Sequence, residues 1–121
     1  MKIMVVDDEV DIQMLFEQRF MKEIKFEKVK FHFALSAESA LEYLKASGTS
    51  DLRVMFSDIN MPGMNGLELL QAVKEEFPSI HVSMITAYSN QYYETAMEYG
   101  AEKYYTKPLD FSALKQDILK G

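Results

Sequence analysis

The chain contains no cysteine among its 121 residues, which excludes a disulfide framework and a metal site built on thiolates, and fits a cytoplasmic protein. No apolar run approaches the roughly 20 residues that a membrane-spanning helix needs. The first residues, MKIMVVDDE, turn acidic without forming a basic stretch followed by a long apolar one, so no export signal is expected. We find no internal repeat or linker and expect a single domain over residues 1–121.

The composition is that of a soluble globular domain. Hydrophobic residues make up 48% of the chain and charged residues 26%, which is ordinary for this class of protein. The formal net charge is −6 at pH 7, and an acidic chain is poorly suited to direct binding of nucleic acid. We therefore expect partners other than nucleic acids or membranes.

Five apolar segments of strand length alternate with segments of helical periodicity. Strands are predicted at Lys2–Val6, Val29–Leu35, Leu52–Ser57, Ile80–Ile85 and Glu102–Tyr105, and each is followed by a predicted helix. This alternation indicates βαβ units and a parallel, doubly wound sheet, because a parallel neighbour is reached only by a crossover. Val29–Leu35 alternates apolar and polar residues, which is typical of an edge strand. Ser36 and Ser89 are predicted helix N-caps.

Polar residues follow the predicted strands at the points where the strands end. Asp7 and Asp8 follow the first strand, and Asp58 follows the third. Thr86 comes after the fourth strand and Lys107 after the fifth. Because ligands of doubly wound sheets bind beyond the carboxyl ends of the strands, we expect these side chains to meet at one edge.

Carboxylates brought together from separate strands repel one another unless a cation is present. The predicted ligands are all oxygens, without histidine or cysteine, which suits Mg²⁺, with Mn²⁺ as an alternative. Taken singly, each residue also has a simpler reading: Asp7 or Asp8 could cap a helix, and Lys107 could be an exposed loop lysine. Their occurrence together at the ends of alternating strands is what favours a functional site.

Five segments carry the motifs of one known family: VVDDE at 5–9, SAESALEYL at 36–44, SDINMPGMNGLELL at 57–70, MITAY at 84–88 and GAEKYYTKP at 100–108. In these segments, and over nearly its whole length, the sequence resembles the receiver domain of bacterial two-component response regulators. The resemblance implies a single-domain α/β fold of the flavodoxin-like, or CheY-like, (βα)5 class. In that fold, five parallel strands lie in the order 2-1-3-4-5 with helices on both faces.

The resemblance also implies that the chain is a phosphorylation-activated switch that catalyses only its own phosphotransfer and autodephosphorylation. Asp58 would accept a phosphoryl group from the phosphohistidine of a sensor histidine kinase or phosphotransfer protein. Thr86 and Lys107 would bind the phosphoryl oxygens, and the Lys107–Pro108 peptide bond would be cis. Mg²⁺ would be held by Asp7, Asp8, Asp58 and the backbone carbonyl of Asn60.

By the same resemblance, Thr86 would move toward the phosphoryl group, and the ring of Tyr105 would change rotamer to fill the vacated space. The face formed by the fourth predicted helix, the fifth strand and the last helix would then change and control an effector domain, a downstream protein or a phosphorylation-dependent homodimer. Asn60 and Tyr88 would flank the path of water and tune the lifetime of the phosphoryl group.

Two alternatives stay open at this point. Asp58 and Asn60 also resemble the Asp-x-Asp loop of Mg²⁺-dependent haloacid dehalogenase-like phosphatases, although that loop normally follows the first strand of its domain. The chain could also be a binding module that keeps the fold without being phosphorylated. The complete set of Asp7, Asp8, Asp58, Thr86 and Lys107 argues against that second alternative.

Overall fold

The computed structural model describes residues 1–88 and 90–119. In this part of the chain, a five-stranded parallel sheet has the order β2-β1-β3-β4-β5, which confirms the predicted topology. The strands are β1 (Lys2–Val6), β2 (Lys30–Ala34), β3 (Leu52–Asp58), β4 (His81–Thr86) and β5 (Tyr104–Thr106). The alternating segment forms β2 and lies at the edge of the sheet, as its pattern indicated.

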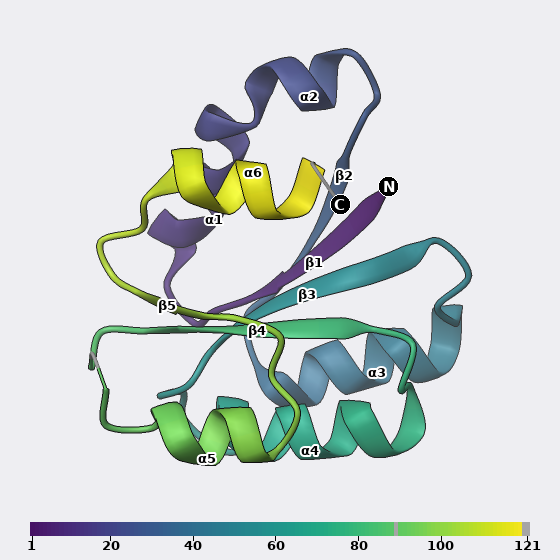
Figure 1. Cartoon of the computed structure of the whole chain (residues 1–121). Helices are drawn as coiled ribbons and strands as arrows, with labels where there is room; N and C mark the ends of the chain where they lie inside the picture. The colour runs from purple at the N-terminus through teal and green to yellow at the C-terminus, as the bar shows by residue number, and fades with distance from the viewer. Residues whose placement is uncertain (89, 120–121) are drawn as a thin grey trace.

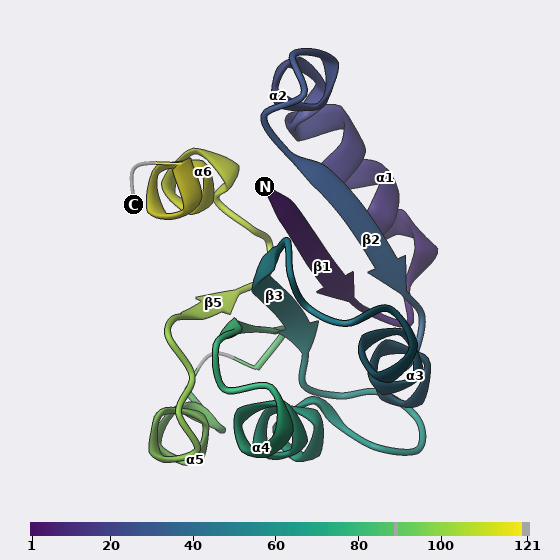
Figure 2. The ribbon, with the colours of Figure 1, turned by 90° about the vertical axis from the view of Figure 1, so that its right-hand side faces the viewer.

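Helices cover both faces of the sheet. They are α1 (Val10–Arg19), α2 (Met21–Lys25), α3 (Ala37–Ser47), α4 (Gly66–Glu76), α5 (Tyr93–Glu98) and α6 (Phe111–Leu119). Figure 1 shows α1, α2 and α6 on one face and α3, α4 and α5 on the other, and the turned view in Figure 2 shows the same two layers. The sheet is therefore doubly wound, as predicted.

The connection between β1 and β2 differs from the prediction of one helix. The chain leaves the helical conformation at Phe20, where φ is −106° and ψ is 19°, and then forms the short helix α2. The ring of Phe20 is fully buried and stacks on Phe16 at 6.0 Å between ring centroids. Burying this ring at the break accounts for two helices where periodicity alone indicated one.

Two apolar clusters form the core, one on each face of the sheet. The cluster beneath α1 and α6 is rich in phenylalanine: the Phe16 ring lies 5.8 Å from Phe56 and 5.1 Å from Phe111. The cluster beneath α3, α4 and α5 is mainly aliphatic, with buried leucine, valine and methionine side chains. Because β1, β3 and β4 are buried on both faces, their sequences are almost continuously apolar.

Side-chain caps set the starts of two helices beside the sheet edge. Ser36 caps α3 by accepting from the Ser39 backbone N–H at 3.0 Å, which confirms one predicted N-cap, whereas Ser89 lies outside the described residues. Asn65 and Glu68 form a capping box at the start of α4. No helix in the described ranges is long and apolar enough to cross a membrane.

Candidate functional site

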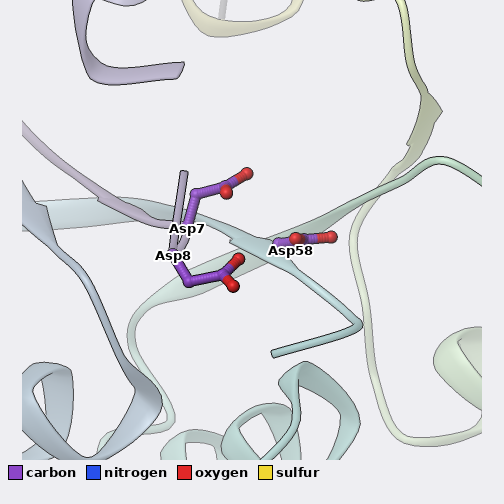
Figure 3. A group of neighbouring side chains, drawn as sticks. All are labelled: Asp7, Asp8 and Asp58. Atoms are coloured by element: carbon purple, nitrogen blue, oxygen red, sulfur yellow. The ribbon is translucent and has the colours of Figure 1, made fainter. Parts of the chain in front are cut away.

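Three aspartates meet at the carboxyl edge of the sheet. Asp7 directly follows β1, and Asp58 is the last residue of β3, which pairs with β1. Each of Asp7, Asp8 and Asp58 offers a carboxylate oxygen, and these oxygens all lie within 4.8 Å of one another. Figure 3 shows the three side chains extending from the strand ends into the same region. The structure thus brings together the acidic residues that the strand ends predicted.

The carboxylates of this cluster are held in an unfavourable environment. Asp7 is 4% exposed and Asp58 is 6% exposed, whereas Asp8 is at the surface. Burial, followed by the charge of Asp7, raises the pKa of Asp58 from its ordinary value of 3.8 to about 6. Burial also raises the pKa of Asp7, although Lys107 and the Glu9 backbone N–H oppose that rise. The cluster therefore favours the binding of a cation, and its oxygen donors fit a hard ion such as Mg²⁺.

Lys107 brings a positive charge to the same cluster. It follows β5, and the Lys107–Pro108 peptide bond is cis, as predicted. Its Nζ donates to Asp7 Oδ2 at 3.1 Å and to Glu9 Oε1 at 3.1 Å, and it lies 3.7 Å from Asp58 Oδ2. Burial alone would lower the pKa of Lys107, but Asp7 and Asp58 raise it overall. The contact between Lys107 and Glu9 was not predicted. The sequence indicated it only in that Glu9 is a third acidic residue after β1.

Thr86 lies on the strand next to Asp58. Thr86 is the last residue of β4 and is fully buried. Ile85, the residue before Thr86, pairs with Asp58 in the register of β3 and β4. The Thr86 hydroxyl oxygen accepts from the Tyr88 backbone N–H at 3.0 Å. The hydroxyl is thus held at the sheet edge that carries the aspartates.

Asn60 and Tyr88 lie in two different loops but are linked through one tyrosine. Asn60 is exposed, two residues after Asp58, and its Oδ1 accepts from the Tyr92 hydroxyl at 3.5 Å. The ring of Tyr88, which is 52% exposed, meets the Tyr92 ring edge to face at 6.4 Å. The structure therefore gathers the two predicted lifetime residues on one side of the site, with Tyr92 between them.

The structure contradicts the predicted position of Tyr105. In the register of β4 and β5, Tyr105 pairs with Ile85, the residue before Thr86. Because successive side chains of a strand point to opposite faces, Tyr105 shares a face with Ile85 and not with Thr86. Tyr105 packs in the cluster beneath α1 and α6, where its hydroxyl donates to Asp117 Oδ2 at 2.5 Å. It therefore cannot fill space that Thr86 vacates.

Tyr104 lies on the face where Tyr105 was expected. Its ring packs against the cluster beneath α3, α4 and α5, and it meets the Tyr93 ring edge to face at 5.4 Å. Its hydroxyl donates to the Tyr88 carbonyl at 3.2 Å and accepts from the Tyr92 backbone N–H at 3.3 Å. Sequence reasoning missed this residue, although alternation counted back from the end of β5 could have identified it.

The loop that follows Asp58 is held at both ends. The Gly66 N–H donates to the Ile59 carbonyl at 2.8 Å, and a Cβ atom on Gly66 would lie 2.0 Å from the Asp58 carbonyl oxygen. From α3, the Glu38 carboxylate accepts from the Met64 N–H at 2.9 Å. This hydrogen bond lowers the pKa of Glu38. Helix α4 thus begins in direct contact with the backbone of Asp58.

Comparisons with known proteins agree with this arrangement. The chain is 34% identical over 109 residues to the DNA-binding transcriptional regulator NtrC of Proteus hauseri, covering 89% of this chain and 22% of that protein. It therefore spans about a fifth of the length of that regulator. It is 31% identical over 122 residues to the chemotaxis protein CheY1 of Helicobacter pylori, covering 98% of this chain and 94% of that protein.

A solved structure gives the same result. The response regulator protein TrrA of Thermotoga maritima, in complex with Mg²⁺ and BeF, superposes with a TM-score of 0.78 at 28% identity, covering 98% of this chain and 96% of that one. These relatives are signalling proteins, and they do not favour the phosphatase alternative. A family model described as the response regulator receiver domain matches residues 3–119, a range that includes all of the sheet except Lys2 and the whole cluster at its edge. On this match and on the doubly wound fold, the chain belongs to the response regulator receiver domain family.

Proposed function

We propose that Asp58 accepts a phosphoryl group from the phosphohistidine of a sensor histidine kinase or phosphotransfer protein. One observation carries the proposal: Asp58 is a nearly buried carboxylate at the end of β3, with the Lys107 ammonium 3.7 Å away and Asp7 and Asp8 beside it. An acceptor carboxylate needs an opening toward the donor and compensation for the charge that arrives. The exposed Asp8 marks the open side, and Lys107 supplies the charge.

Asp58, Lys107 and Thr86 each have a separate role in the proposed phosphoryl transfer. An oxygen of Asp58 bonds to phosphorus while the P–N bond to the donor imidazole breaks, and the leaving nitrogen keeps the electron pair and takes up a proton. Lys107 balances the negative charge of the phosphoryl oxygens. The Thr86 hydroxyl accepts from the Tyr88 N–H, which leaves its own proton free to donate to a phosphoryl oxygen. The phosphoryl group thus sits between the ends of β3, β4 and β5.

The acidic residues are the proposed ligands of a divalent ion. Asp7, Asp8 and Asp58 would hold Mg²⁺, or Mn²⁺ in its place, together with the backbone carbonyl of Asn60. When bound, the ion reduces the repulsion between Asp58 and the incoming phosphoryl group. Burial and the charge of Asp7 raise the pKa of Asp58, which means that its ionised form is unfavourable in this site. A bound cation would stabilise that ionised form, and this supports the assignment.

In this proposal, Thr86 and Tyr104 change position when Asp58 is phosphorylated. Movement of Thr86 toward the phosphoryl group would break its contact with the Tyr88 N–H and release the segment whose carbonyl binds the Tyr104 hydroxyl. The face made by α5, β5 and α6 would then change. As a cytoplasmic receiver over residues 1–121, the chain would use that face to control an effector domain, a downstream protein or a homodimer.

A separate surface fits the docking of the phosphodonor. Val10 and Met14 lie one helical turn apart at the start of α1, which follows the acidic residues after β1, and each is 56% exposed. Exposed apolar side chains so near the acceptor would be covered by the donor protein during transfer. This contact would position the donor histidine above Asp58.

Hydrolysis of the acyl phosphate would end the signal. Asn60 and Tyr88 flank the exposed side of the site, so both would control how water reaches the phosphoryl group. Tyr88 is large enough to act as a cover, and Tyr92 holds both loops at that point. In this proposal the chain catalyses its own dephosphorylation at a rate set by these two side chains.

Incubation with Mg²⁺ and acetyl phosphate, followed by intact-protein mass spectrometry, tests the assignment. We expect the mass of one phosphoryl group to be added, in a base-labile form, and to be lost in Asp58→Asn. Asp51→Asn is the matched control, because Asp51 is exposed at the opposite end of β3. Phosphate uptake by Asp58→Asn equal to that of the parent would refute the assignment. Steady release of inorganic phosphate from many phosphate esters would instead favour a phosphatase.

A further inference from the structure

A cavity of about 440 Å³ lies on the face of the sheet beneath α6 and extends to the starts of β3 and β4. Its walls include the starts of β3 and β4, with Arg53 and His81, and the C-terminal half of α6, with Asp117 and Ile118. Figure 2 shows α6 on the face away from α4 and α5. Five residues along β3, or roughly 17 Å, separate Arg53 from Asp58. The cavity is therefore distinct from the aspartate cluster, and its volume is in the range of small-molecule sites.

The cavity is lined mainly by apolar surface and carries charged groups of both signs. Two acidic side chains line it, and both have partners: Glu102 contacts His81 Nδ1 at 3.1 Å, and Asp117 accepts from the Tyr105 hydroxyl. Arg53 and Lys103 also line it, and neither makes an ion pair with any residue in the described ranges. A negatively charged group at this site would thus meet two cations without displacing an existing ion pair.

A serine hydroxyl also lines the cavity. Ser83 lines the cavity, is 5% exposed, and lies in the middle of β4, opposite Phe56 on β3. Its hydroxyl oxygen is not among the buried side-chain atoms that lack a hydrogen-bond partner in residues 1–88 and 90–119. The hydroxyl lines the cavity, so a polar atom of a bound molecule would be able to bond to it.

We propose that this cavity binds a small amphipathic anion. Its aromatic or aliphatic body would lie over Phe56 and Ile118, and its carboxylate, sulfonate or phosphate would be placed between Arg53 and Lys103. A polar atom on the body would bond to Ser83. Such a ligand would connect the starts of β3 and β4 to α6. The proposal does not depend on phosphorylation of Asp58, because Asp7, Asp8 and Asp58 are not among the residues that line the cavity.

Anilinonaphthalene sulfonate, which combines an aromatic body with one negative charge, is a direct probe. We expect saturable binding of one molecule per chain, with a dissociation constant on the order of 10 to 100 µM for a ligand of this size. Arg53→Gln and Lys103→Gln should each weaken binding roughly threefold to tenfold, as expected for loss of one partly exposed charge contact. Lys45→Gln is the matched control, because Lys45 is an exposed lysine on α3, and it should leave the affinity unchanged.

Two further measurements complete the test. Ser83→Leu fills the cavity and should abolish binding, and circular dichroism of each variant verifies that the fold is kept. Amide chemical shifts in NMR spectra should change at Ser83, Lys103 and Asp117 when the probe is added. Unsaturable binding, equal affinity in the Arg53 and Lys45 variants, or shifts confined to the exposed residues Val10 and Met14 would each overturn the proposal.

Discussion

Replacing Asp58 with asparagine should stabilise the fold at neutral pH in the absence of a divalent ion. The native structure raises the pKa of the Asp58 carboxyl from 3.8 to about 6, chiefly through burial and the charge of Asp7. Asparagine has nearly the same shape and carries no charge. The substitution therefore removes the cost of ionising a buried carboxylate next to two other carboxylates.

The size and pH dependence of this effect follow from the two pKa values. In the unfolded chain Asp58 loses its proton near pH 3.8, and in the folded chain near pH 6. As the pH rises through this window the unfolded state is favoured, so the parent loses stability until the folded carboxyl is also ionised. At about 1.4 kcal/mol per pKa unit, the full difference is about 3 kcal/mol. Asp58→Asn should show this gain above pH 7 and almost none below pH 4.

Urea denaturation of the parent and of Asp58→Asn between pH 4 and pH 8 measures the effect. At pH 7.5 a gain of about 3 kcal/mol corresponds to a rise of about 10 °C in the thermal midpoint. Mg²⁺ should stabilise the parent and have a smaller effect on Asp58→Asn, and Asp51→Asn should behave as the parent. A stability difference between parent and Asp58→Asn that does not vary with pH, or a less stable variant at pH 7.5, would show that the repulsion argument is wrong.

Three further predictions follow from the loops around the site. Tyr88→Ala should shorten the lifetime of the phosphoryl group roughly fivefold, equivalent to about 1 kcal/mol of barrier, because it removes a cover; a longer lifetime in a phosphate-release assay would contradict this. Tyr104→Ala should reduce phosphorylation-dependent dimerisation or partner binding in sedimentation experiments while leaving phosphate uptake intact. Tyr105→Ala should not reduce either dimerisation or partner binding. The reverse result would favour Tyr105 as the switch residue. Glu38→Ala should weaken Mg²⁺ binding by roughly threefold in calorimetry, because it releases the loop after Asp58. Glu42 lies one turn further along α3 and serves as the control. An equal effect of Glu42→Ala would count against a specific role of Glu38.

Much of the fold and of the acidic site could be predicted from the sequence, because both depend on local patterns. Asp7, Asp58 and Lys107 each follow a recognisable strand, and the parallel topology brings the ends of those strands to one edge. The assignment of Tyr105 failed for a different reason. Two consecutive tyrosines in a three-residue strand point to opposite faces, and the choice between them depends on the register with β4.

Contacts between distant segments were also beyond prediction. The hydrogen bond from Met64 to Glu38 joins residues 26 positions apart, and neither residue type indicates the other. The cavity near Ser83 depends on where α6 packs across the sheet, and a short apolar helix can pack over several strands. The break at Phe20 likewise reflects the burial of one ring in the tertiary structure, which helical periodicity does not encode.

The contact between Gly66 and the backbone of Asp58 limits which parts of the molecule can move. Because there is no room for even a methyl group between them, the first turn of α4 is packed directly against the end of β3. A displacement of α4 would be expected to shift Asp58, the proposed acceptor, relative to Lys107. If phosphorylation of Asp58 switches the chain as proposed, we expect the motion to occur in the segments after β4 and β5 while α4 keeps its place.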